Sequence, residues 1–223
     1  HRLSGCDARR VGELFPFCPS LDLMNIIIVR NNYGDSALIN KVPAIVYDFL
    51  PETAQLRNER PLFLPDFANP AQVQLYLAVR ICRLGRNISE RFAHRYYDAA
   101  TVIPHFSAPT AHEAENSGTQ RPTAAAAGFD NALPTGRFIP IDRTALSQCE
   151  FSLRLNGEEK LKGHGNALPQ NADRLIAQIS HYHTVRNGDL ILLGTPPNHL
   201  LLGPEGRVET YLNDECVLSF KIK

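Results

Sequence analysis

The sequence predicts a mixed α/β domain that is rich in β-strands and carries a few short helices. The 223 residues include 16 prolines and 14 glycines, which favour turns over long helices. Residues 73–81 have apolar side chains at every odd position, which gives a strand one hydrophobic face at period two. The alternating run 149–155 ends at Asn156-Gly157, a dipeptide typical of a β-hairpin turn. Together these observations indicate strands that short turns join into sheets.

The remaining elements follow in order along one domain without internal repeats. Short apolar or alternating runs predict strands at residues 25–29, 43–49, 62–64, 73–81, 101–103, 149–155, 190–193, 207–212 and 216–222. Two helices are expected after the polar caps Ser89 and Asn171, the second over residues 172–180. Residues 107–128 are small, polar and interrupted by Pro and Gly, so they predict a long loop.

The first 23 residues differ from the rest of the chain. They show no helical or strand period, and Met24, the sole methionine, directly precedes the first strand. We therefore expect residues 1–23 to be a leader or an N-terminal extension that need not be native, and residues 24–223 to form the domain. A native arm that docks loosely on the domain is the open alternative.

Charge and cysteine spacing exclude several classes of protein. The 23 Lys and Arg residues balance 23 Asp and Glu residues, so the whole chain presents no basic field toward nucleic acid or anionic lipid. The longest apolar run, Ile26–Val29, is far shorter than the roughly 20 residues of a membrane helix. The five cysteines form no Cys-x-x-Cys pair, which is typical of a reducing compartment. We expect a cytoplasmic protein that binds neither nucleic acid nor membranes.

Six motifs resemble, in order and spacing, the single-domain form of the fumarylacetoacetate hydrolase family, also called fumarylacetoacetase C-terminal domain-like. They are Asn-Tyr-Gly-Asp at 32–35, Gly-Arg-Asn-Ile-Ser-Glu at 85–90, Gly-Phe-Asp at 128–130, Leu-Asn-Gly-Glu at 155–158, Gly-Asp-Leu-Ile at 188–191 and Gly-Thr-Pro at 194–196. The resemblance implies a β-roll or sandwich fold. It also implies a magnesium or manganese ion, held by two glutamates and an aspartate, and a proton-moving His–Glu pair that acts on 2-oxo acids or 1,3-diketones.

When the sequence is aligned with the family on these motifs, other residues stand at the positions of the metal ligands and of the His–Glu pair. Gln74 and Tyr76 stand where the family has its two glutamates, and His105 stands where it has the aspartate. Ser36 and Ile39 replace the histidine and the glutamate that move the proton. Magnesium is a hard cation that prefers carboxylate oxygens. We therefore expect the family's metal-dependent catalysis to be lost and predict no cofactor; magnesium or manganese would apply if the family mechanism survives.

The resemblance also predicts which residues line the emptied cleft. These are Tyr33, Ser36, Gln74, Tyr76, His105, His112 and Thr195. Two other chemistries stay open there. Ser36 and a histidine could act as nucleophile and base, although no acid is placed to orient the imidazole. His105, His112 and Glu113 could hold zinc, although their spacing does not match one helix turn.

Three functions are compatible with these residues. The first is a pseudoenzyme that serves as a binding or partner subunit, paired with itself or with an active relative. The second is an active hydrolase, decarboxylase or tautomerase on a 2-oxo acid or 1,3-diketone. The third is a sensor of a small ligand in the emptied pocket. Assembly is expected to be a homodimer, because strands 207–212 and 216–222 carry little charge on their edge before Lys221.

Overall fold

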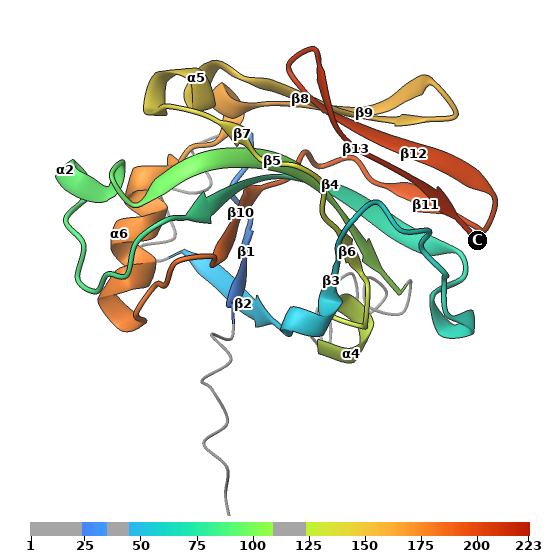
Figure 1. Cartoon of the computed structure of the whole chain (residues 1–223), viewed down its shortest axis with the longest axis horizontal. Helices are drawn as coiled ribbons and strands as arrows, with labels where there is room; N and C mark the ends of the chain where they lie inside the picture. The colour runs from blue at the N-terminus through green and yellow to red at the C-terminus, as the bar shows by residue number, and fades with distance from the viewer. Residues whose placement is uncertain (1–23, 35–44, 109–123) are drawn as a thin grey trace, which may run out of the picture.

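The computed structural model describes residues 24–34, 45–108 and 124–223, and it is built mainly of β-strands (Figure 1). The strands are β1 Ile26–Arg30, β2 Val46–Leu50, β3 Gln55–Leu56, β4 Ala71–Ile81, β5 Tyr97–Ser107, β6 Leu133–Pro134, β7 Ile139–Pro140, β8 Glu150–Leu155, β9 Glu158–His164, β10 Leu190–Gly194, β11 Leu200–Leu202, β12 Gly206–Leu212 and β13 Glu215–Ile222. This confirms the strand-rich mixed fold that the sequence predicts.

Helices are short in the part of the chain that the structure describes. They are α2 Glu90–Ala93, α4 Ala124–Ala127, α5 Arg143–Gln148 and α6 Ala172–Tyr182, with 3₁₀ turns η2 Glu52–Ala54, η3 Asp66–Ala68 and η4 Gly165–Ala167. The predicted cap of α6 is confirmed, since the Asn171 side chain accepts a hydrogen bond of 2.9 Å from the Arg174 amide. None of the helices described here is both long and apolar enough to cross a membrane.

Two sheets pack against each other. The larger has the order β2-β1-β10-β4-β5-β7 with β11 also paired to β4, and the smaller has the order β13-β12-β8-β9. Figure 1 shows the smaller sheet on one side of β4 and β5, and β3, β6 and α4 on the other. The central strands are therefore covered on both faces.

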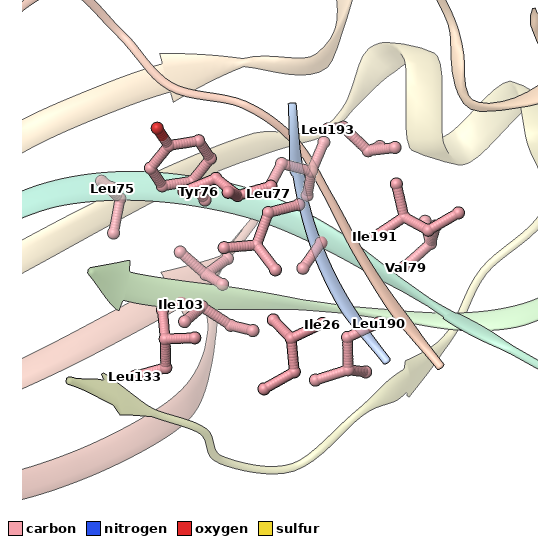
Figure 2. Packing of buried hydrophobic residues seen from close by; sticks show 14 of the residues in the cluster. Ile26, Leu75, Tyr76, Leu77, Val79, Ile103, Leu133, Leu190, Ile191 and Leu193 are labelled. Carbon is pink, nitrogen blue, oxygen red and sulfur yellow. The ribbon is translucent and has the colours of Figure 1, made fainter. Parts of the chain in front are cut away.

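Because both faces of β4 are covered, side chains on both of its faces belong to the hydrophobic core. The odd-numbered residues of β4 are fully buried, as their alternation predicts, and Figure 2 shows Leu75, Leu77 and Val79 among them. The intervening Tyr76 and Ala78 are buried as well, at 1% and 0% exposure. The period-two pattern identified one buried face, and the second arises because distant segments cover it.

A buried carboxylate fixes the first strand to the sheet. Asp189 is 0% exposed, and its oxygens accept hydrogen bonds of 2.7 Å from the Asn25 amide and 2.7 Å from the Arg186 amide. The Asn25 side chain donates a third bond of 3.2 Å. Charge-assisted bonds of this kind are stronger than neutral ones. They align the start of β1 with the start of β10, which run in parallel.

Two sequence-based expectations for local structure are wrong. Residues 62–64 do not form a strand within a sheet: Leu62 makes an isolated bridge to Ile222, because Pro61 and Pro65 on either side have no amide hydrogen to donate. The helix expected after Ser89 is present as α2, but the predicted cap is wrong, because the Ser89 side chain makes no capping bond.

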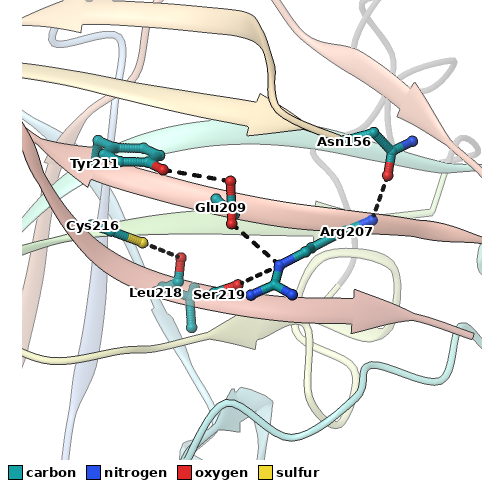
Figure 3. Close-up of polar contacts among 7 residues, drawn as sticks. All are labelled: Asn156, Arg207, Glu209, Tyr211, Cys216, Leu218 and Ser219. Carbon is teal, nitrogen blue, oxygen red and sulfur yellow. Dashed lines mark hydrogen bonds and ion pairs between the residues drawn. The ribbon is translucent and has the colours of Figure 1, made fainter.

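The edge of β13 is also different from what the sequence predicts. Instead of lying open for pairing, it bonds to its own chain: the Leu62 amide donates to the Lys221 carbonyl at 2.9 Å, and the Arg137 amide donates to the Val217 carbonyl at 2.9 Å. On the ladder of β12 and β13, the Arg207 guanidinium bridges Glu209 and Ser219 (Figure 3). The premise that this edge lies open for pairing with a second copy is therefore wrong, and the homodimer itself stays a prediction.

Candidate active-site cleft

Three of the predicted site residues lie together on the paired strands β4 and β5. Gln74 is the register partner of His105, and Tyr76 lies two residues along on the same face. The Tyr76 hydroxyl donates to Gln74 Oε1 at 3.5 Å, and the rings of Tyr76 and His105 are 6.0 Å apart between centroids. Tyr76 and His105 are each 1% exposed, whereas Gln74 is half-buried. Of these three side chains, Gln74 is the one that solvent reaches.

The protonation of His105 follows from its hydrogen-bond partner. Nε2 lies 2.5 Å from the carbonyl oxygen of Ala127, the last residue of α4. A carbonyl only accepts, so Nε2 carries the proton and donates it. This bond ties the cleft to the segment that follows residues 109–123. It also means that Nε2 has no lone pair to offer a metal ion.

These residues do not fit the divalent ion that the family resemblance implies. The family's three carboxylates are an amide, a phenol and an imidazole here, and the amide oxygen and one imidazole nitrogen already serve other partners. Magnesium and manganese favour anionic oxygen ligands, and three neutral groups supply no such charge. Within the described ranges, no three side chains of His, Cys, Asp or Glu gather around a common point.

Tyr33 and Thr195 lie where the ends of β1 and β10 meet. Buried Asn32 holds this junction, because its side chain donates to the carbonyls of Gln170 and Leu193, each at 2.9 Å. A Cβ on Gly194 would lie 2.3 Å from the Asn32 carbonyl oxygen, so only glycine fits. The Tyr33 hydroxyl accepts a bond of 3.0 Å from the His164 amide, which makes it part of the scaffold of the cleft.

The other predicted cleft residues lie outside the described residues. They are Ser36, Ile39, His112 and Glu113. The positions of the family's proton-moving pair, and the alternatives of a Ser–His pair and a zinc site, therefore stay predictions.

Sequence reasoning missed a polar cluster formed by Tyr97, Arg143 and Asp173. These residues line a cavity of about 200 Å³ at the N-terminus of α6. Asp173 gave no signal in the sequence, because an acid in the first turn of a helix is ordinary at the surface. It is in fact 1% exposed.

The family model for the fumarylacetoacetate (FAA) hydrolase C-terminal region matches residues 29–222. The mitochondrial oxaloacetate decarboxylase of Dictyostelium discoideum is 28% identical over 176 residues, which cover 77% of this chain and 80% of that protein. The mitochondrial oxaloacetate tautomerase of Mus musculus is 24% identical over 203 residues, with 89% and 91% covered. A solved structure of a fumarylacetoacetate hydrolase family protein from Yersinia pestis superposes with a TM-score of 0.79 at 25% identity, covering 91% and 95%. The chain therefore belongs to the fumarylacetoacetate hydrolase family.

Proposed function

We propose that this chain is a family member that has exchanged metal-dependent catalysis for a binding or partner role. The observation that carries the proposal is the donor set at the expected metal position. Gln74, Tyr76 and His105 bring no negative charge, and His105 Nε2 is bound to a backbone carbonyl. A family reaction on a 2-oxo acid needs a cation to stabilise the developing enolate, and three neutral side chains are poor ligands for such a cation.

The cleft keeps groups that suit a small polar ligand. The half-buried Gln74 amide can donate hydrogen bonds to a ligand, and the rings of Tyr76 and His105 pack behind it. Such a site favours a neutral molecule over a dicarboxylate, because a buried anion without a counter-charge is costly. A sensor or carrier of a small ligand is therefore one form of the proposed role.

An active enzyme is the second candidate. It is favoured by the names of the two relatives, an oxaloacetate decarboxylase and an oxaloacetate tautomerase. Under this hypothesis the residues at 36, 39 and 112 would have to supply the chemistry that Gln74, Tyr76 and His105 lack.

Oxaloacetate turnover separates the two candidates. We expect the purified chain, with magnesium or manganese added, to consume oxaloacetate no faster than the same buffer and metal without protein. Loss of oxaloacetate absorbance and formation of pyruvate would be followed, with the Dictyostelium decarboxylase as the active control. Protein-dependent pyruvate formation that disappears with a chelator would refute the proposal and establish the second candidate.

The partner role is proposed to begin with a homodimer. The outer edge of β2 pairs with no other strand in the described part of the sheet, and Phe49 on it is 41% exposed. Phe49 stacks edge-on against His183, with ring centroids 4.8 Å apart, so an aromatic surface lies beside an open strand edge. Closed two-fold pairing is the commonest way to cover such a surface.

Light scattering at micromolar concentration is expected to give twice the chain mass of 24.8 kDa. Phe49→Lys should shift the mass to that of the monomer, because it places a charge in the contact. The matched control is Leu201→Lys on β11, where Leu201 is 61% exposed and lies on a different strand. A monomeric natural chain, or a dimer that survives Phe49→Lys, would contradict the proposed contact.

We propose a reducing compartment such as the cytoplasm for this protein. In its support, the three cysteines that the structure describes, Cys82, Cys149 and Cys216, form no disulfide. The two curated relatives carry mitochondrial names, and the mitochondrial matrix is reducing as well.

A further inference from the structure

A polar cavity lies between α5, η4, α6 and the end of β10. Its volume is about 200 Å³. Polar groups from Tyr97, Arg143, Ser147, Asn166 and Asp173 face it, and an apolar part is formed by Leu146, Leu168 and Leu193. None of the described residues predicted for the cleft lines this cavity, so it is a separate site.

The carboxylate of Asp173 is buried beside Arg143 and Tyr97, with fewer well-aligned hydrogen bonds than a buried anion needs. It is 1% exposed, and neither of its oxygens accepts a hydrogen bond of ordinary geometry from the described residues. Arg143 Nε lies 2.8 Å from Oδ2 as an ion pair whose N–H does not point at the oxygen. Leaving a buried charge so poorly satisfied is unfavourable, and a donor that enters from the cavity would satisfy it.

The neighbouring Tyr97 lies beside the same carboxylate. Burial first, then the charge of Asp173 and a side-chain hydrogen bond toward it, raise the pKa of the Tyr97 hydroxyl far above its usual value. The hydroxyl therefore stays protonated and is a donor beside Asp173. Tyr97 belongs to β5, so the cavity connects the central sheet with the helices above it.

Groups that favour an anion face the same cavity. The Arg143 guanidinium is 57% exposed and uses Nε for the ion pair, which leaves its two terminal nitrogens directed elsewhere. The cavity also borders the first turn of α6, where the Asn171 oxygen caps the Arg174 amide and not the amides of Ala172 and Asp173. A helix N-terminus with an adjacent guanidinium attracts a carboxylate.

We propose that this cavity binds a small zwitterion, a free α-amino acid with a short side chain. The ammonium group would donate to Asp173, and the carboxylate would lie against Arg143 and the first turn of α6. The cavity volume of about 200 Å³ admits a small molecule such as alanine or serine. The leucines and Ser147 would contact the short side chain.

A purely structural role for Arg143 and Asp173 does not explain their poor alignment or the open space beside them. If Arg143 and Asp173 served to join α5 to α6, an aligned hydrogen bond and a filled interior would be expected, as in most buried ion pairs. Here the pair is misaligned and the space beside it is open. Binding at this cavity is independent of the residues at the metal position.

Thermal unfolding with a panel of free amino acids tests the site. Alanine, serine and glycine at 10 mM are the probes, with propionate and propylamine as single-charge controls. We expect at least one amino acid to raise Tm by about 3–6 °C when present at ten times its Kd, and the single-charge probes to have little effect. No shift with any of the three amino acids in thermal unfolding and calorimetry would overturn the proposal.

Two variants locate the binding. Asp173→Asn keeps the shape and removes the partner of the ammonium group, and Arg143→Gln removes the partner of the carboxylate; each should weaken calorimetric binding at least tenfold. Arg207→Gln is the matched control, since Arg207 is 58% exposed and ion-paired to Glu209 on the other sheet. Should Asp173→Asn fail to fold, Arg143→Gln decides alone. Unchanged affinity in a folded variant of either residue would overturn the site.

Discussion

Adding magnesium or manganese to the triple variant Gln74→Glu, Tyr76→Glu, His105→Asp is expected to raise its Tm by about 5–11 °C, whereas the natural chain does not respond. An ion at 100 times its Kd stabilises a folded protein by about 2.7 kcal/mol, and each kcal/mol shifts Tm by about 2–4 °C in a chain of this size. The three carboxylates would lie on one face of β4 and β5, where they repel one another until a cation joins them.

The control for this experiment is Gln74→Glu alone, because one carboxylate at the mouth of the cleft does not chelate. Calorimetry should show no binding to the natural chain and to this control. If the triple variant unfolds without metal, recovery of its near-ultraviolet circular dichroism on adding the ion is the equivalent result. Turnover of oxaloacetate should stay low, because Ser36 and Ile39 still lack the family's base. Tight magnesium binding by the natural chain would show that the donor set has been misjudged.

Asp189→Ala is expected to lower the free energy of unfolding by about 3–5 kcal/mol, the cost of breaking a buried charged network. The change removes three hydrogen bonds and leaves the amides of Asn25 and Arg186 without their acceptor. Urea unfolding followed by circular dichroism measures the loss. Asp214→Ala, at the exposed turn between β12 and β13, is the matched control and should change stability by less than about 0.5 kcal/mol.

A loss of less than about 1 kcal/mol at Asp189 would mean that water or a neighbouring group replaces the carboxylate. That outcome would contradict the role given to Asp189 in holding β1 against β10. Asp189→Asn offers a graded comparison, since the amide keeps one acceptor oxygen and should cost less than alanine.

Local patterns predicted much of the fold, because period and capping are properties of short segments. The alternation at residues 73–81 is found in β4, and the cap at Asn171 begins α6. The same patterns could not predict that Tyr76 is buried on the opposite face, since the cover comes from β3, β6 and α4 (Figure 1). Helix α5 was missed because six residues are too few for a helical period to show.

The sequence likewise predicted one part of the candidate site and could not predict another. Register along β4 and β5 places Gln74, Tyr76 and His105 together, and the structure brings them together. The bond from His105 to Ala127 joins residues 22 positions apart in the sequence, so no local pattern could indicate it. The ion pair of Arg143 with Asp173 joins two separate helices, so no local pattern in the sequence could predict it either.

The parallel pairing of β1 with β10 has a consequence for synthesis. Asn25 and Asp189 are 164 residues apart in sequence, yet they start adjacent strands near the middle of the larger sheet. At about 5–20 residues per second, a ribosome needs roughly 8–33 s to make the intervening chain. During that time the apolar segment Ile26–Val29 has no β10 to pair with. The larger sheet therefore closes only after β10 has been synthesised, and β1 is the segment on which a chaperone would act.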